Sequence, residues 1–291
     1  MHPPVVRLPV AAPFAGAALL DFLHRHQVAG VEAGESEIRS DGTSRSWYAR
    51  TVALPHGPGW VRLTWDGVLT AELAVDPRDV EAALAGIRHL VDAETDPVAV
   101  DSHLAADPAL ADLVARTPGL RVPGVLDAAE MVVRTVIGQQ VSLASARAAA
   151  ATISARHGTP VVTGVPGLSL LFPTPAQLAA VDPATLPMPR ARGRSLVALA
   201  ERIADGRLDL SDGPDLGQTR ADLLACPGIG PWTADYVLMR ARHAPDILLS
   251  TDLVLARELT ARGITNPGRW SPYRSYGAMH LWHDFLNRPR G

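Results

Sequence analysis

Two short motifs in the last third of the chain carry residue types that could act on a phosphate-linked sugar. The first is the Pro-Gly-Ile-Gly turn at 227–230, which lies between two helical patterns, and the second is Thr251-Asp252 at the start of another. Glycines in such a turn leave backbone N–H groups and the positive end of the next helix dipole open to a phosphate. The pair predicts a DNA-binding helix-hairpin-helix followed by an acid that acts on the bound strand.

Asp252 has two interpretations. Breaking the bond between a base and its sugar builds positive charge on the sugar, and a fixed carboxylate would stabilise that charge or orient the attacking water. Alternatively, Asp252, Thr251 or Ser250 caps the helix expected to begin at Leu253. The two roles are compatible, because a helix N-terminus favours a negative charge. The spacing alone leaves both open.

The length and composition are those of a globular chain of about two domains. The chain has 291 residues, of which 47% are hydrophobic and 20% are charged. No stretch approaches the roughly 20 apolar residues of a membrane span, and the first residues lack the pattern of a secretion signal. We therefore expect a cytoplasmic protein. Cys226 is the only cysteine, which excludes an internal disulfide and a cluster held by four thiolates.

The charge of the chain is unusual for a protein that binds nucleic acid. The formal net charge is -3 and the pI is about 6.4. We therefore expect the hairpin to bind phosphate through backbone N–H groups rather than through bulk charge. All 27 basic side chains are arginine, which the base composition of a GC-rich genome would explain. Without lysine, the chain has no side-chain amine to form a Schiff base with an opened sugar.

The first 94 residues have the pattern of a small antiparallel sheet with helices on one face. The expected elements are a helix at 17–26, strands at 46–54, 59–65 and 68–75, and a helix at 77–91. Asp66-Gly67 is a hairpin signal between the last two strands. We therefore place a mixed α/β domain at residues 1–94.

From residue 95 onward the pattern is almost entirely helical, and proline and glycine mark the junctions. The candidate helices span residues 103–116, 127–155, 174–181, 191–205, 220–224, 232–242, 253–262 and 275–287. The predicted fold class is α+β, with the small antiparallel-sheet domain placed before an all-α core.

Several motifs occur in a fixed order along this helical part. They are Pro118-Gly119-Leu120-Arg121-Val122-Pro123-Gly124, Ile137-Gly138-Gln139-Gln140-Val141-Ser142, Phe172-Pro173-Thr174-Pro175, the hairpin with Pro231-Trp232-Thr233-Ala234, Thr251-Asp252, Tyr273-Arg274-Ser275-Tyr276 and His280-Leu281-Trp282. Over residues 117–286 this series closely resembles the bacterial inducible 3-methyladenine DNA glycosylase II family, within the helix-hairpin-helix glycosylase superfamily. The resemblance implies two helical lobes in 95–291. One is 124–244 with the hairpin, the other is 95–123 plus 245–291, and the active-site cleft lies between them.

The resemblance places the catalytic carboxylate on Asp252 and a base pocket around five aromatic side chains. These are Trp232, Tyr236, Trp282, Tyr273 and Tyr276. An alkylated base is positively charged, and stacking and cation–π contacts are worth about 1–3 and 0.5–2 kcal/mol. Energies of this size imply a broad substrate range. The alternative for each of these five aromatic side chains is that it packs in the hydrophobic core and does not contact the base.

The resemblance also implies which residues hold the DNA and a structural ion. They are Gly228, Ile229, Gly230 and Thr233 for DNA binding, Gln139 and Gln140 for a wedge that replaces a flipped base, and the carbonyls of Leu224, Cys226 and Ile229 for a monovalent cation. The phosphate contacts themselves are expected from the N–H groups of Gly228, Gly230 and Trp232. Some members present an apolar residue where this chain has Gln140, and an exposed helix kink at Gly138 is the alternative to a wedge. No cofactor is expected to be required.

Bifunctional relatives carry a lysine directly after the hairpin, where this chain has Trp232. We therefore expect a monofunctional glycosylase that removes bases such as 3-methyladenine and 7-methylguanine from double-stranded DNA and leaves an abasic site. The expected protein is a bacterial, nucleoid-associated monomer without membrane contact. Fusion to, or cooperation with, an alkylation-response regulator stays open. The alternatives are a bifunctional glycosylase/lyase and a non-catalytic hairpin protein that binds damaged DNA.

Overall fold

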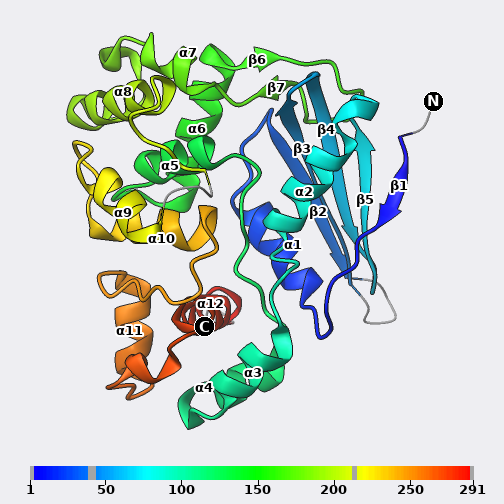
Figure 1. The fold of residues 1–291 in the computed structure, drawn as a ribbon, viewed down its shortest axis with the longest axis vertical. Helices are drawn as coiled ribbons and strands as arrows, with labels where there is room; N and C mark the ends of the chain where they lie inside the picture. Colours follow the sequence, from blue (N-terminus) through cyan, green and yellow to red (C-terminus); the bar gives the residue numbers. More distant parts are fainter. Residues whose placement is uncertain (1–2, 39–43, 212–214, 289–291) are drawn as a thin grey trace.

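The computed structural model describes residues 3–38, 44–211 and 215–288. A five-stranded antiparallel sheet stands on one side of the molecule and a body of helices on the other (Figure 1). The sheet is built from the N-terminal part of the chain, and the segments that follow are mainly helical. This arrangement confirms the predicted α+β class.

The sheet has the strand order β1-β5-β4-β3-β2, and all neighbouring strands are antiparallel. Its strands are β1 (Val5–Arg7), β2 (Glu32–Ile38), β3 (Ser44–Leu54), β4 (Gly57–Trp65) and β5 (Leu69–Ala74). The three central strands lie where the alternating pattern predicts them. The two edge strands are missing from the prediction. β1 has only three residues, and β2 contains glycine and three glutamates in place of alternating apolar side chains.

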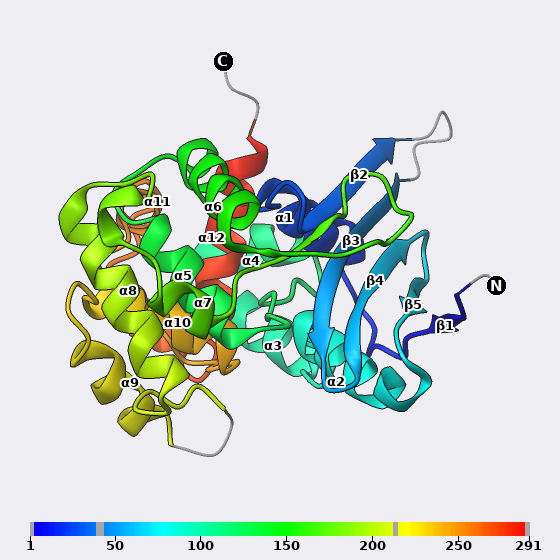
Figure 2. The ribbon, with the colours of Figure 1, turned by 90° about the horizontal axis from the view of Figure 1, so that it is seen from above.

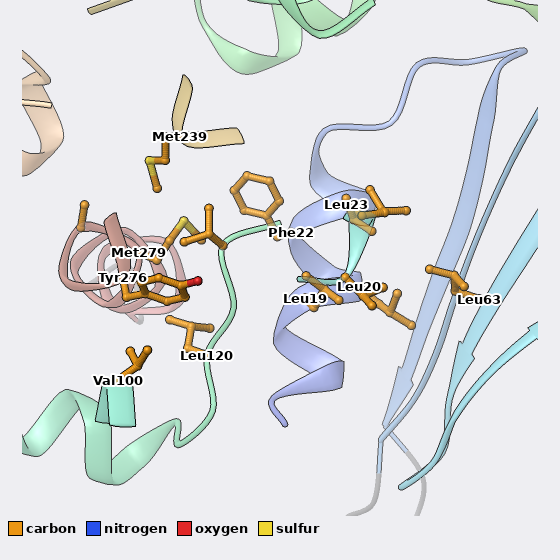
Figure 3. Packing of buried hydrophobic residues seen from close by; sticks show 14 of the residues in the cluster. Leu19, Leu20, Phe22, Leu23, Leu63, Val100, Leu120, Met239, Tyr276 and Met279 are labelled. Carbon is orange, nitrogen blue, oxygen red and sulfur yellow. The ribbon is translucent and has the colours of Figure 1, made fainter. Parts of the chain in front are cut away.

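Helices α1 (Gly16–Arg25) and α2 (Val80–Leu90) cover one face of the sheet, as predicted. Leu20 and Leu23 of α1 lie on the side of Leu63 in the sheet, whereas Phe22 projects from the other side of the helix towards the helical body (Figure 3). Because its apolar residues face two directions, α1 packs between two layers. It therefore joins the sheet to the helices.

The helical body begins after residue 95. Its helices are α3 (Pro97–Ala105), α4 (Pro108–Arg116), α5 (Ala128–Ile137), α6 (Leu143–His157), α7 (Pro175–Ala179), α8 (Arg190–Ala204), α9 (Leu216–Leu224), α10 (Pro231–Ala241), α11 (Leu253–Ala261) and α12 (Arg274–Asn287). The single helix predicted at 103–116 is wrong. Pro108 has no N–H with which to continue α3, and it begins α4 instead, with Asp107 as the N-cap.

The long helix predicted at 127–155 is also divided, into α5 and α6. Gln140 has a positive φ of 55°, which an α-helix does not allow. The chain becomes helical again after Ser142, whose hydroxyl accepts a hydrogen bond from the N–H of Ser145 at 3.2 Å. The turn between the two helices contains the residues predicted to form the wedge.

A two-stranded ladder interrupts the helical region. β6 (Thr159–Pro160) pairs with β7 (Leu170–Leu171), and the connection between them runs across to the sheet (Figure 2). There Val165 and Leu168 pack against Trp60, on the face opposite α1 and α2. The prediction of an almost wholly helical chain after residue 95 is wrong at this loop. Contacts with the sheet fix the conformation of the loop, and its own sequence has no pattern that would predict a strand.

Two large hydrophobic cores occupy the molecule. One is shared by the sheet, α1 and α2 with α3, α4, α11 and α12, and the other is built from α5 to α10 with the chain around Val28 and Val31. The second predicted lobe thus shares its core with the sheet, whereas most of the hairpin-bearing lobe has a core of its own. The domain boundary at residue 94 stays a prediction. Among the described residues, no helix has both the length and the apolar character needed to cross a bilayer.

We expect His280 on α12 to make the stability of the fold depend on pH. Its side chain is 2% exposed, and its Nε2 has no hydrogen-bond partner among the described residues. Burial, with a smaller contribution from His283, lowers its pKa from 6.5 to about 4. As the pH falls from 6.5 to about 4, His280 binds a proton in the unfolded chain but stays neutral in the folded chain. We expect this residue to reduce the free energy of unfolding by up to roughly 3 kcal/mol over that range.

Urea unfolding of the wild type and of His280→Phe, from about pH 7 down to about pH 4.5, measures this effect. The phenylalanine variant cannot take up the proton, so it should lose less stability than the wild type. Part of the loss should remain, because burial also lowers the pKa of His26 to about 4. An identical loss in both proteins would contradict the role given to His280.

Candidate active site

A cavity of about 410 Å³ lies where α1, α5, α10 and α12 meet. Its wall includes Trp232, Tyr236, Asp252 and Trp282, which are four of the residues that the sequence predicts for catalysis and base binding. Val141, from the turn between α5 and α6, also lines it. The volume falls within the range of about 300–1,000 Å³ that is typical of small-molecule sites.

Asp252 is half-buried and forms the N-cap of α11. Its Oδ1 accepts hydrogen bonds from the N–H of Leu255 at 2.8 Å and from the indole N–H of Trp282 at 3.2 Å. Its Oδ2 accepts a hydrogen bond from the indole N–H of Trp232 at 3.0 Å. All three donors are neutral, so they orient the carboxylate without cancelling a negative charge on it. Asp252 is therefore both a helix cap and part of the cavity wall.

Three aromatic rings stand around this carboxylate. Trp232 and Tyr236 of α10 stack with their centroids 5.1 Å apart and their planes at 15°, and Trp282 meets Tyr236 edge-on at 6.1 Å. Because the N–H edges of both indoles are engaged by Asp252, the rings are held in fixed orientations. Aromatic faces carry partial negative charge and attract cations. The cavity thus combines a carboxylate with electron-rich walls, which suits a planar, electron-poor ring.

Phe22, His26 and Arg240 also line the cavity, and the sequence interpretation does not include them. The guanidinium of Arg240 donates a hydrogen bond to the hydroxyl of Tyr236 at 2.8 Å and lies 4.8 Å from the centroid of Phe22. The ring of His26 stacks on Phe22 at 4.2 Å. Burial lowers the pKa of His26 to about 4, so its ring is neutral near pH 7. Helix α1 and His26 directly after it therefore supply part of the cavity wall.

A cluster of five polar side chains forms the part of the cavity wall between the sheet and α5. Its members, here called the buried charge cluster, are Glu32, Tyr48, Arg50, Glu130 and Arg134. Glu130 lies 2.5 Å from Arg50 and 2.8 Å from Arg134, and Arg134 lies 3.0 Å from Glu32. Burial raises the pKa of Glu32, but Arg134 and Arg50 outweigh it and hold that pKa below its ordinary value. The cluster joins the sheet to α5 by paired charges.

The predicted hairpin is formed by α9, the turn at 225–230 and α10. Gly228 has a φ of 81°, and a Cβ at this position would lie 2.5 Å from the hydroxyl of Ser195 on α8, so glycine is required there. Gly230 is the N-cap of α10 and offers no side-chain cap. Within the described ranges, the N–H groups of Gly228 and Gly230 donate to no backbone carbonyl. They are therefore open to an anion, and their contact with phosphate stays a prediction.

Ile229 and Thr233 are placed differently from the two glycines. Ile229 is buried, and its N–H donates to the carbonyl of Cys226 at 3.1 Å. The side chain of Thr233 is also buried, and its hydroxyl accepts a hydrogen bond from the side-chain amide of Gln139 at 3.1 Å. Ile229 thus donates its N–H to the turn itself, and the hydroxyl of Thr233 contacts the predicted wedge.

The two wedge residues differ in their contacts. The amide of Gln139 also donates to the carbonyl of Gly228 at 3.0 Å, which fixes this turn against the hairpin. Gln140 is exposed, has no hydrogen bond from its side chain among the described residues, and adopts a left-handed backbone conformation. The neighbouring Val141 is 41% exposed. Gln140 is therefore the member of the pair that is free to enter a partner molecule.

Tyr273 and Tyr276 do not line the cavity, which corrects the prediction of a pocket with five aromatic side chains. Tyr276 is 3% exposed, and its hydroxyl donates to Asp92 at 2.9 Å. Tyr273 packs edge-on against Tyr276 and against His103, at 6.2 and 5.5 Å. For these two residues the core-packing interpretation applies.

The carbonyls predicted to hold a cation lie around the hairpin turn. The carbonyl of Cys226 accepts a hydrogen bond from the N–H of Ile229. Among the described residues, the carbonyls of Leu224 and Ile229 accept no backbone hydrogen bond apart from any within a helix. This oxygen set is compatible with a monovalent ion. Side chains provide no alternative, since no group of three or more His, Cys, Asp or Glu residues in the described ranges could hold a metal.

Comparisons with known sequences identify close relatives. The model of the AlkA N-terminal domain family matches residues 5–127. "DNA-3-methyladenine glycosylase 2" of Escherichia coli K12 is 33% identical over 282 residues, which cover 93% of this chain and 94% of that protein. "Probable bifunctional transcriptional activator/DNA repair enzyme AlkA" of Mycobacterium tuberculosis H37Rv is 41% identical over 287 residues, 95% of this chain and 56% of that protein. The chain thus spans about half the length of the mycobacterial relatives that it matches.

Solved structures with the same fold are more distant in sequence. A 3-methyladenine DNA-glycosylase from Archaeoglobus fulgidus superposes with a TM-score of 0.76 at 18% identity, over 99% of this chain and all of that one. An 8-oxoguanine glycosylase/lyase from Clostridium acetobutylicum, solved with double-stranded DNA, gives a TM-score of 0.67 at 15% identity, over 87% and 88% of the two chains. At these identities the similarity concerns the fold alone.

Proposed function

Since the chain belongs to the DNA-3-methyladenine glycosylase 2 (AlkA) family, we propose that it removes alkylated bases from double-stranded DNA by hydrolysing the bond between base and deoxyribose. The observation that carries the proposal is the carboxylate of Asp252, oriented by Trp232 and Trp282 in a cavity with aromatic walls. The expected substrates are 3-methyladenine, 7-methylguanine and similar cationic bases.

The aromatic walls bind the damaged base once it has left the duplex. The rings of Trp232, Tyr236 and Trp282 stack against it and attract its positive charge. Such contacts contribute about 1–3 kcal/mol for stacking and roughly 0.5–2 kcal/mol for the cation. Energies of this size separate damaged from normal bases only partly. The weakened glycosidic bond of the damaged nucleotide supplies the rest, which predicts a broad substrate range.

Asp252 acts on the sugar. The base leaves with both electrons of the glycosidic bond, so a cationic base becomes neutral and needs no general acid. Positive charge then develops on C1′ and the ring oxygen, where a negative carboxylate stabilises it. Water adds its oxygen to C1′, and its proton passes to Asp252 or to solvent. The products are a free base and an abasic site in an unbroken strand.

The hairpin and the turn after α5 hold the DNA. The free N–H groups of Gly228 and Gly230, at the N-terminus of α10, bind phosphate oxygens. Gln140 enters the space that the flipped base leaves and offers hydrogen bonds to the orphaned partner base. Gln139 links the two elements through its bond to Gly228, so the positions of wedge and hairpin are coupled.

The protein leaves the sugar–phosphate backbone intact. The chain contains no lysine, and Trp232 lies in the first turn of α10, just after the hairpin turn, where it donates to Asp252. A lyase step would need an amine that attacks C1′ and forms a Schiff base. We therefore expect no covalent complex when the protein is incubated with damaged DNA and borohydride. A trapped complex would favour the bifunctional alternative.

The remaining proposals concern cofactors, oligomeric state, cellular location and partners. No cofactor is required for hydrolysis, and a monovalent cation on the carbonyls of Leu224, Cys226 and Ile229 would have a structural role only. The protein acts as a monomer in the cytoplasm, near the nucleoid. A functional link to an alkylation-response regulator is supported by the mycobacterial relative, whose name includes a transcriptional activator.

The proposal is tested by incubating the chain with methylated duplex DNA and separating the released bases by chromatography. We expect both 3-methyladenine and 7-methylguanine among the products, without release of normal guanine at a comparable rate. A protein that binds abasic DNA yet releases no base would be the non-catalytic hairpin protein.

A further inference from the structure

Three arginine side chains without partners lie at the start of α8. They are Arg190, Arg192 and Arg194; the first and third are exposed and the second is half-buried. Within the described ranges, none of them makes a hydrogen bond, an ion pair or a ring contact. The first turn of α8 contains no acidic residue. Arg207, another exposed arginine of this lobe, is by contrast neutralised by Asp205 at 2.6 Å.

The α8 helix runs alongside the hairpin. Ser195 lies against the turn, because a Cβ on Gly228 would come within 2.5 Å of its hydroxyl. Two turns later, the positive charge of Arg202 acts on the thiol of Cys226, at the start of the turn: burial raises the pKa of that thiol, and Arg202 partly offsets the rise. The N-terminal end of α8 therefore lies at the tip of the hairpin, and its C-terminal part lies beside the end of α9. This geometry places the first two turns of α8, which carry the three arginines, beside Gly228 in the hairpin turn.

The same hairpin tip contacts the wedge turn on its other side. The side chain of Gln139 donates to the carbonyl of Gly228 at 3.0 Å and to the hydroxyl of Thr233 at 3.1 Å. Gly138 and Val141, which flank the wedge, line the cavity. The wall of the cavity, the wedge turn, the hairpin tip and the start of α8 thus form one continuous series of contacts.

We propose that Arg190, Arg192 and Arg194 bind phosphates of the DNA duplex beside those that the hairpin holds. This inference rests on the proposed function. A guanidinium matches the geometry of a phosphate through paired N–H donors and keeps its charge at all relevant pH values. Arg190 and Arg194 lie about 6 Å apart along the axis of α8 on one face, whereas Arg192 lies on a different face. The α8 arginines therefore contact about two phosphates.

The proposal explains how a chain with a net charge of -3 holds a polyanion. The charge that matters is local: three positive side chains lie on the first two turns of α8, and this helix packs against the hairpin turn. Phosphate contacts by side chains make binding depend on salt, because each one releases condensed counterions. Contacts through neutral backbone N–H groups do so much less. The salt dependence of binding consequently reports on the α8 arginines.

The test measures the affinity of the full chain for a duplex with a stable abasic analogue, by fluorescence anisotropy over a series of NaCl concentrations. The variant R190Q/R192Q/R194Q should bind more weakly. Its plot of log affinity against log salt should be less steep than that of the wild type by roughly 2 units, since each lost phosphate contact contributes about 0.9. R190K/R192K/R194K, which keeps the charges, should retain most of the wild-type slope.

The matched control is R7Q/R78Q/R88Q, which removes three arginines from the sheet and its helices, and its slope should equal that of the wild type. An unchanged slope in the α8 triple variant, or an equal change in the control, would overturn this inference. In both cases wild-type binding and base release would persist. Failure of the wild type to bind the abasic duplex would instead overturn the proposed function.

Discussion

Asp252→Asn should reduce the excision of 3-methyladenine by roughly 10²- to 10³-fold, the usual cost of removing one preorganised group that stabilises transition-state charge. Asparagine keeps an oxygen that can accept from the N–H of Leu255, so the cap of α11 is retained. Its amide lacks the negative charge that a developing sugar cation needs. Single-turnover release of the base from methylated duplex measures the effect, and binding of abasic duplex by the same variant should change little.

The matched control is Asp215→Asn. Asp215 caps α9 in the same way, since its carboxylate accepts the N–H of Gln218 at 3.0 Å, but it does not line the cavity. This variant should excise at the wild-type rate. Full activity of Asp252→Asn would show that Asp252 only caps its helix. Equal losses of excision rate in both variants would show that the loss comes from disturbing a helix cap and not from removing a catalytic carboxylate.

Glu130→Gln should lower the free energy of unfolding by about 3–5 kcal/mol, the cost of removing one partner from a buried ion pair. Glu130 is 5% exposed and contacts both Arg50 and Arg134. Without its charge, Glu32 alone compensates two buried guanidinium groups. Because Glu130 lies on α5 and Arg50 on the sheet, the loss should also weaken the attachment between the two parts. Urea unfolding monitored by fluorescence measures the change.

An exposed ion pair provides the comparison for this prediction. Asp112 and Arg116 lie 2.9 Å apart on α4 with both side chains more than half exposed. Because water screens such a pair, Asp112→Asn should cost less than about 1 kcal/mol. If Glu130→Gln were no more destabilising than Asp112→Asn, the buried charge cluster would not hold the sheet to α5.

Local motifs predict the reactive part of the site well. The order of the motifs identifies the family, and the relatives confirm it. Asp252, Trp232 and Trp282 lie far apart in sequence, yet the structure joins them by hydrogen bonds. Those two bonds do not follow from the sequence, because the orientation of an indole N–H depends on how α10 and α12 pack. The role of Asp252 in the reaction stays a prediction.

Residues outside the motifs were not predictable in this way. Phe22 belongs to an ordinary apolar helix, and only the packing of α1 between the sheet and the helical body brings it to the cavity. The buried charge cluster joins residues of β2, β3 and α5, and β2 itself has no strand pattern. The two tyrosines at 273 and 276 show the reverse error, since a family motif predicted a pocket where the structure has a core.

Helix boundaries depended on signals of different strength. The Asp107-Pro108 step is a visible stop and start signal, which the apolar periodicity of 103–116 obscured. No comparable signal marks Gln140, because a positive φ at a residue other than glycine requires support from the surrounding structure. Here Gln139 supplies it by bonding to the hairpin.

The most direct test of the central claim uses a duplex with a single 3-methyladenine and an excess of the protein. Free base and strand breaks are counted in the same reaction, before and after alkali. We expect one strand break for each released base after treatment with alkali, and no strand breaks before it. Absence of released base, from a preparation shown to bind the abasic duplex, would contradict it.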